Sequence, residues 1–249
     1  MSKKKPRGKP QTATRSRWWL AASAILSGLT LVAYWNSFHV PLVFDDMETI
    51  QRNASVRFGE FTGGLLFGRA FLYASFTLNY LWSGQNVWSY HLINFLLHFM
   101  NGILVFITAE RVFRNIENNV ELRRRYAAVA AALFLVHPVQ TESVTYISSR
   151  SELLSTFFYL AGFLIFVLWP QQRIGFLCSL AVGIAYLFGL GSKETVVTLP
   201  AAIFLYDSIF LSKAEFRPII SRWRFYLTYI VGAGAVIYYL LVVNVGLRG

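Results

Sequence analysis

Three carboxylates stand together just after the first long apolar run of the chain, at Asp45, Asp46 and Glu48. Neighbouring carboxylates repel one another unless a cation or a proton-transfer role makes use of them. Asp45 and Asp46 could therefore bind Mg²⁺ or Mn²⁺ through oxygen, or one of them could be the general base that deprotonates a hydroxyl. The alternative is that both are solvated loop acids.

A second polar set recurs within the apolar run 90–110. His91, Asn94 and His98 are spaced by three and four residues, so they share one face of a helix. His91 and His98 would lie about 10 Å apart along the axis, which is too far to chelate one ion together. The stripe predicts hydrogen bonds to neighbouring helices or, for His91, a place in the wall of a site.

The stretch "LFLVHPVQTESVTYISSRSELL", residues 133–154, combines a helix break with polar residues. Pro138 interrupts an apolar run that is too short to cross a bilayer. Backbone that is not helical at membrane depth must face protein or a watery cavity, so His137 and Glu142 are expected to line such a cavity as ligands or an acid–base pair. The end of the stretch, Ser149 to Glu152, matches a capping box that would begin the next helix.

Two cations are candidates to hold an anionic phosphate, Arg150 in that stretch and Lys193 in the hairpin "GLGSKETVVTLP". Ser192 is expected to cap the helix that follows, which places Lys193 in a first turn where the helix dipole disfavours a cation unless an anion is bound. The dipole explains Glu194 directly. A plain Lys–Glu surface pair is the alternative.

The elements that must position these residues are membrane helices. A composition of 55% hydrophobic and 14% charged residues would leave a soluble domain of 249 residues with apolar surface that it could not bury. Apolar runs of roughly the length needed to cross a bilayer recur along the chain. We expect an all-α integral membrane bundle of about seven spans, at 18–38, 90–110, 126–137, 152–169, 174–190, 195–210 and 225–246.

The distribution of Lys and Arg predicts the orientation of these spans. Most of the 23 Lys and Arg residues fall in the N-terminal tail and in alternate loops, as expected of cytoplasmic segments. The N-terminus is therefore expected in the cytoplasm, and the net charge of +11 indicates topology and anionic lipid rather than nucleic acid. We expect a basic tail at 1–17, an uncleaved anchor helix, and a membrane domain at 18–249 whose outer loop, 39–89, carries the acidic motif. The single cysteine, Cys178, excludes a disulfide framework.

Four stretches in register resemble one known family: "FDDMETIQRN", "LNYLWSGQNVWSYHLINFLLHFMNGILVF", "LFLVHPVQTESVTYISSRSELL" and "GSKETVVTLPAAIFLYD". The chain resembles the GT-C superfamily of membrane glycosyltransferases, which use sugars carried on polyprenyl phosphates. It is most similar to the transmembrane and tetratricopeptide-repeat O-mannosyltransferases and their bacterial relatives. The resemblance covers about residues 40–207.

The resemblance implies a transfer of a mannose-like sugar from a polyprenyl-phosphate donor to a hydroxyl acceptor, a protein Ser/Thr or a glycan, at the non-cytoplasmic face. It implies that Asp45 or Asp46 is the catalytic carboxylate and that the other supports it or binds a metal. It places His137 and Glu142 in the active cavity and His91 in the wall. It also places Arg150 and Lys193, beside Glu194, near the lipid phosphate, and it includes Arg69, although the proline that usually follows this arginine is missing.

Two departures keep other functions open. The family's membrane domain has more than seven spans, so we expect a chain that is incomplete at its C-terminus. A non-catalytic membrane protein or scaffold that binds lipid-linked sugars is therefore the alternative, and a small transporter is a third class that the scarcity of charges in mid-span disfavours. The expected location is a bacterial inner membrane, or the endoplasmic reticulum membrane if the source is eukaryotic.

Overall fold

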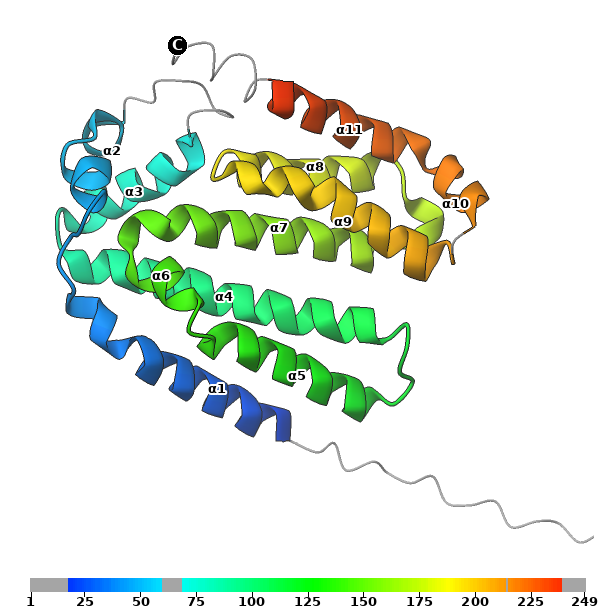
Figure 1. Cartoon of the computed structure of the whole chain (residues 1–249), viewed down its shortest axis with the longest axis horizontal. Coiled ribbons are helices and arrows are strands. Elements are labelled where there is room, and N and C mark those ends of the chain that lie inside the picture. The colour runs from blue at the N-terminus through cyan, green and yellow to red at the C-terminus, as the bar shows by residue number, and fades with distance from the viewer. Residues whose placement is uncertain (1–17, 60–68, 214, 239–249) are drawn as a thin grey trace, which may run out of the picture.

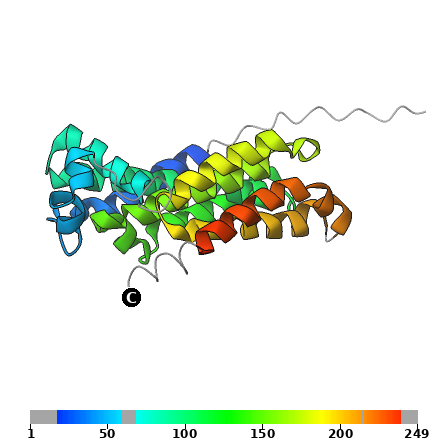
Figure 2. The same cartoon turned by 90° about the horizontal axis from the view of Figure 1, so that it is seen from above.

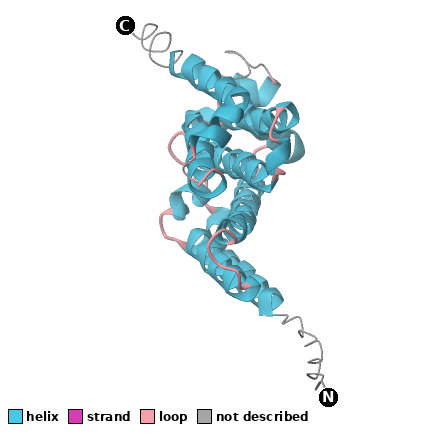
Figure 3. Cartoon of the chain, turned by 90° about the vertical axis from the view of Figure 1, so that its right-hand side faces the viewer, coloured by secondary structure: helices cyan, strands magenta, loops and turns pink. Residues whose placement is uncertain are grey.

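A computed structural model describes residues 18–59, 69–213 and 215–238, and all regular structure in these ranges is helical (Figure 1, Figure 3). The expected all-α class is confirmed. The basic tail at 1–17 lies outside the described residues, as does the end of the last predicted span, 239–246.

Within the described residues, every apolar run that the sequence predicts to span is largely helical. The long helices are α1 (Trp18–Tyr34), α4 (Val87–Phe113), α5 (Val120–Val136), α7 (Arg150–Leu168), α8 (Phe176–Leu190), α9 (Leu199–Tyr206) and α11 (Trp223–Tyr238). Further helices lie on the connections between them: α2 (Ala54–Phe58), α3 (Ala70–Ser83), α6 (Gln140–Thr145) and α10 (Phe216–Ser221). The described part of the segment 39–89, expected as an outer loop, contains the π turn Met47–Gln51, α2, α3 and the start of α4.

Within the described ranges, three continuous helical stretches are long and apolar enough to cross a membrane: Val87–Phe113, Ile147–Leu168 and Glu194–Leu211. The third consists of α9 extended by a 3-10 turn before it and a π turn after it. The chain is an integral membrane protein on this evidence. The count of seven spans and the cytoplasmic N-terminus remain predictions.

The long helices lie side by side, with their own axes roughly along the longest axis of the molecule (Figure 1, Figure 2). We call this arrangement the stack, and its two ends are the two ends of the helices. α4 packs between α5 and α7, α1 covers α5, and α7 packs against α8 and α9, which α11 covers in turn. Two of these contacts need glycine. A Cβ on Gly102 of α4 would lie 2.4 Å from Leu135 of α5, and one on Gly162 of α7 would lie 2.9 Å from Leu199.

One end of the stack gathers the residues that the sequence singled out. α2, α3, α6 and the start of α7 lie at this end, which we call the rim (Figure 1). A buried apolar cluster joins the rim elements to the bundle; its members are Ile50, Val56, Leu72, Phe76, Tyr90, Ile147 and Leu154. The loop elements at the rim are therefore anchored by packing and can hold polar groups in fixed positions.

Candidate active site

Asp46 is an anchor rather than a free acid. It is 1% exposed, and its Oδ1 accepts hydrogen bonds from the Ser148 backbone N–H at 2.8 Å and from the Ser148 hydroxyl at 2.6 Å. Its Oδ2 accepts from the Val43 N–H at 3.2 Å. Each hydrogen bond to a charged group contributes about 1.5–3 kcal/mol, so Asp46 ties the acidic turn to a segment 102 residues further along the chain.

Asp45, the next residue back, is exposed, and no hydrogen bond to its carboxylate is present among the residues that the structure describes. Its backbone N–H donates to the Tyr146 hydroxyl at 3.0 Å, and its carbonyl accepts from Thr49 at 2.8 Å. The backbone of Asp45 is therefore fixed while its carboxylate stays available. This difference separates the two aspartates, which the sequence left as equivalent candidates.

The backbone before Asp45 is strained. Phe44 has φ of 48°, a left-handed conformation that is uncommon for a residue other than glycine, and its ring meets the Tyr146 ring edge-on with centroids 6.4 Å apart. Such a conformation persists when its surroundings enforce it, and it costs about 1–3 kcal/mol. The bond from Asp45 to Tyr146 and the bonds to Asp46 supply that enforcement.

Tyr146 stands beside both aspartates. Burial raises the pKa of its phenol, and the charges of Asp45 and Asp46 act in the same direction, although the bond from the Asp45 N–H opposes them. The phenol is therefore protonated at neutral pH, and because its oxygen accepts from Asp45 it still has a hydrogen to donate.

Asp46 has little capacity left to bind a divalent cation. Mg²⁺ and Mn²⁺ need several free oxygen ligands, but both oxygens of Asp46 already accept hydrogen bonds from the protein. Across the described ranges there is no group of three or more His, Cys, Asp or Glu side chains that could hold a metal ion.

The polar stripe on α4 donates hydrogen bonds to backbone carbonyls of neighbouring segments that lack a partner within their own helix. His98 donates from Nε2 to the Leu135 carbonyl at 3.0 Å. That carbonyl lacks a helical partner because α5 ends at Val136, just before the break that Pro138 predicts. His91 likewise donates from Nε2 to the Val40 carbonyl at 3.0 Å, in the non-helical segment that leads to the acidic turn. His91 is 1% exposed, so it holds the backbone that leads to the acidic turn without itself facing solvent.

Arg150 is not placed to hold a lipid phosphate. It is 0% exposed, and all three guanidinium nitrogens already donate to the protein. Its Nε and Nη2 donate to the side-chain oxygens of Asn94 and Asn79, each at 2.8 Å, and backbone carbonyls of Tyr90 and Ser75 accept the remaining bonds. Burying the cation costs several kcal/mol, and these bonds offset that cost. The expectation of a phosphate contact is wrong for this residue, because no guanidinium nitrogen reaches the surface.

Lys193 pairs with Glu152, and the two side chains are 23% and 41% exposed. This pairing replaces the expected capping box, because α7 begins at Arg150 without a side-chain cap from Ser149. Ser192 does not cap either; its hydroxyl donates back to the Phe188 carbonyl at 2.9 Å.

Arg69 and Glu194 lie beside that pair. Their side chains approach to 3.7 Å and are each 47% exposed. The Phe71 N–H also donates to the Gly191 carbonyl at 3.1 Å, which joins the start of α3 to the hairpin. Two cations and two carboxylates thus gather at the hairpin and remain partly open to solvent.

The acidic turn and the hairpin attach to one short stretch. Ser148 binds Asp46, and Glu152 binds Lys193. Four residues at a rise of 1.5–2.0 Å separate these attachment points by about 6–8 Å. The acidic turn and the hairpin, far apart in sequence, are therefore attached close to one another at the rim.

His137 follows the end of α5 and Glu142 lies in the first turn of α6, and both are exposed. The His137 Nδ1 accepts from the Val139 N–H at 3.1 Å, which closes a local turn. In the part of the chain that the structure describes, no hydrogen bond joins His137 to Glu142 or either of them to the aspartates. The structure does not bring these two residues together as an acid–base pair.

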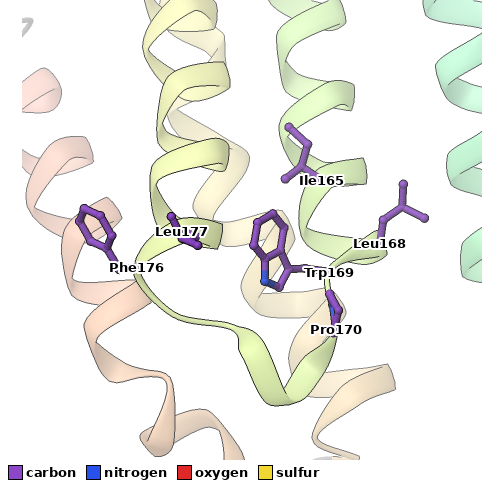
Figure 4. Close-up of a pocket in the computed structure, with 6 residues that line it drawn as sticks. All are labelled: Ile165, Leu168, Trp169, Pro170, Phe176 and Leu177. Carbon is purple, nitrogen blue, oxygen red and sulfur yellow. The ribbon is translucent and has the colours of Figure 1, made fainter.

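An apolar pocket of about 580 Å³ lies at the other end of α7 and does not contribute to this site. Ile165, Leu168, Trp169, Pro170, Phe176 and Leu177 line it, around the connection from α7 to α8 (Figure 4). α7 has 19 residues, so its two ends are about 27 Å apart. The pocket lining includes no ionisable side chain.

Sequence reasoning missed three residues that build the site, Asn79, Tyr146 and Ser148, and it assigned Arg150 a phosphate contact where the structure gives it a packing role. Asn79 lies in the segment expected as an outer loop, and Ser148 lies just before the predicted capping box. The spacing of Asn94 on the α4 stripe could have pointed to these residues, because a buried asparagine needs hydrogen-bond partners on a neighbouring segment.

Comparison with curated proteins supports the resemblance. The chain is 31% identical over 203 residues to the protein O-mannosyl-transferase Tmtc1 of Drosophila melanogaster, which is 75% of this chain and 23% of that protein. It is 28% identical over 222 residues to tmtc2 of Xenopus laevis, covering 81% of this chain and 26% of the relative. It is 31% identical over 156 residues to human TMTC3, covering 56% and 16% respectively.

The chain thus spans about a quarter or less of the length of these curated relatives. No protein-family model and no solved structure matches it. The resemblance inferred from the four motifs is nevertheless confirmed by several relatives that share one name. The chain is similar, over 56–81% of its own length, to part of several proteins named as protein O-mannosyl-transferases, in line with the GT-C resemblance of the four motifs.

Proposed function

We propose that this chain transfers a mannose-like sugar from a polyprenyl-phosphate donor to a hydroxyl acceptor, a protein Ser or Thr, at the non-cytoplasmic face of the membrane. The names of the relatives, which are protein O-mannosyl-transferases, support the reaction class and the acceptor. The observation that carries the residue assignment is the difference between the aspartates: Asp46 is bound on both oxygens, and Asp45 is exposed with its backbone fixed.

In this proposal Asp45 is the general base. The acceptor hydroxyl attacks the anomeric carbon, its proton passes to the Asp45 carboxylate, and the bond between the anomeric carbon and the phosphate oxygen breaks with inversion. Polyprenyl phosphate leaves with the electron pair. General-base catalysis contributes typically about 10²–10⁴-fold, provided that the base is within hydrogen-bond reach of the proton.

Lys193 and Arg69 are the cations available to the phosphate. Each is paired with a partly exposed carboxylate, Glu152 and Glu194 respectively, so a phosphate that arrives from the membrane can share or replace these partners. Charge held at this position stabilises the leaving group. His137 and Glu142 have no proton-transfer step here, because neither contacts the aspartates.

The test compares Asp45→Asn with Asp46→Asn and Glu48→Gln, using polyprenyl-phosphate mannose and a Ser/Thr peptide. Asp45→Asn should lower kcat by about 10³-fold while the protein stays folded, because the carboxylate has no structural bond. Asp46→Asn should lower thermal stability as well. Glu48→Gln, a change of the same kind in the same turn, is the control and should leave kcat unchanged.

Full turnover by Asp45→Asn would remove Asp45 as the base. Binding of the donor by the unmodified chain without any transfer would instead favour the alternative function, a membrane protein that binds lipid-linked sugars without chemistry.

A further inference from the structure

Arg150 is a fully buried cation that has no carboxylate partner among the described residues. Its acceptors are all neutral: two asparagine side chains and two backbone carbonyls. The face of the Phe76 ring lies 4.3 Å from its guanidinium carbon and adds a cation–π contact. A helix does not need a buried arginine at its start. The hydrogen-bond partners of Arg150 therefore indicate its role.

Asn94 connects Arg150 to the segment that holds the aspartates. Arginine can only donate, so the Asn94 oxygen must face it, and this sets the orientation of the whole amide. The Asn94 Nδ2 then points at the carbonyls of Tyr146 and Ile147, both at 3.4 Å. Asn94 is 0% exposed, so water cannot replace either partner.

The segment held in this way carries both contacts to the acidic turn. The Tyr146 hydroxyl binds the Asp45 N–H, and Ser148 binds the Asp46 carboxylate twice. The connection runs without a gap from Arg150 through Asn94 to residues 146–148 and then to both aspartates.

We propose that Arg150 and Asn94 are positioning residues that set the place of the Asp45 carboxylate, an inference that rests on the proposed function. Arg150 orients the amide of Asn94, the amide fixes the segment 146–148, and that segment fixes the acidic turn. Neither residue touches the substrate.

Asn101 provides a matched control on the same face of the same helix. It is also 0% exposed, and its Nδ2 donates to the Leu153 carbonyl at 2.9 Å. Leu153 has no hydrogen bond to the acidic turn. Replacing Asn101 removes a buried amide of the same kind from α4 but leaves the connection to Asp45 intact.

The experiment compares Asn94→Leu and Asn101→Leu in the 249-residue chain, by steady-state transfer from polyprenyl-phosphate mannose and by hydrogen exchange of a peptide that covers 42–48. In Asn94→Leu the 42–48 amides should exchange about 10-fold faster, and kcat should fall about 100-fold at unchanged KM for the donor. In Asn101→Leu neither quantity should change by more than about 2-fold.

A second variant covers the case in which Asn94→Leu does not fold. Asn94→Asp keeps an acceptor for Arg150 and supplies the missing negative charge, but it puts an oxygen where the NH₂ faced the two carbonyls. It should fold and should show the same faster exchange and lower kcat.

Three results would overturn the inference: unchanged exchange at 42–48 in both Asn94 variants, an equal increase in Asn101→Leu, or faster exchange with full turnover. Absence of turnover in the unmodified chain would overturn the proposed function, and the catalytic part of this inference with it. The exchange data would then still show whether Asn94 holds the turn, so the two failures are distinguishable.

Discussion

The end of α9 and the start of α7 lie at opposite ends of the stack (Figure 1), and each carries a charged side chain that is 0% exposed, Asp207 and Arg150. Of these two, only Asp207 has an opposite charge as a partner among the described residues. Asp207, at the end of α9, accepts from the Ser212 hydroxyl at 2.8 Å and pairs with Arg222 and with the Tyr226 hydroxyl. Arg150, at the start of α7, is held by neutral oxygens alone within the described ranges.

The difference separates a structural ion pair from a positioning cation. The Asp207 cluster joins α9 to the start of α11, and each member finds its partner inside the cluster. The acceptors of Arg150 come from α3 and α4, and one of them, Asn94, continues to the segment that binds the aspartates. A buried charge without a counter-charge is costly, so it is expected where its connections serve another purpose.

The largest effect is expected from Arg150→Met. The change leaves the side-chain oxygens of Asn79 and Asn94 and the Ser75 and Tyr90 carbonyls without this donor in a dry environment. The free energy of unfolding should fall by about 4 kcal/mol, measured by denaturant titration in detergent micelles. Arg57→Met, the same change at an exposed position, should alter it by less than about 0.5 kcal/mol. A loss below about 1 kcal/mol in Arg150→Met would mean that the four acceptors do not depend on the Arg150 guanidinium for their stability.

The Asp207 cluster should respond differently, because its charges can be removed together. Asp207→Asn leaves Arg222 without its carboxylate and should cost about 3 kcal/mol. Adding Arg222→Met should restore about 2 kcal/mol of that loss, so the double-mutant cycle gives a clear coupling energy. Strict additivity of the two changes would show that the pair does not neutralise itself. For Arg150 no such second change exists among the described residues.

The sequence predicted the helices well and the chemistry at the rim only in part. The apolar runs fix where the long helices lie, because backbone in a membrane must satisfy its own hydrogen bonds. α3 was missed, since Asn79 and neighbouring hydroxyl residues interrupt its apolar pattern and 14 residues are too few to span. The break at Pro138 was predicted correctly, because proline removes a helix donor whatever the tertiary context.

The candidate site depended on contacts that no local pattern encodes. Asp45 and Asp46 are adjacent and chemically alike, and only the arrival of Ser148, 102 residues away, makes one of them an anchor. Arg150 was predicted to hold a phosphate because arginine binds phosphate well and because the resemblance places it near the lipid phosphate. Its burial follows from the packing of α3, α4 and α7, which tertiary structure alone determines.

A smaller effect is expected where α4 and α5 approach closely. Gly102→Ala would place a Cβ 2.4 Å from Leu135 Cδ2, so Leu135 must shift. The overpacking should cost about 1–3 kcal/mol, measured by the same titration. Leu135→Ala should relieve most of it when combined with Gly102→Ala. If the combined loss equals the sum of the two single losses, the contact does not set the distance between these helices.

The smallest effect is expected from charge at the rim that is not buried. Glu48 and Arg52 form an ion pair one turn apart, and their side chains are 63% and 71% exposed. Exposed pairs of this kind contribute about 0.3–0.5 kcal/mol because water and salt screen them. Glu48→Gln should therefore change the free energy of unfolding by less than about 0.5 kcal/mol, although Glu48 lies two residues from Asp46. A loss of about 2 kcal/mol would show that Glu48 also stabilises the position of the acidic turn, so that Asp46 is not its sole anchor.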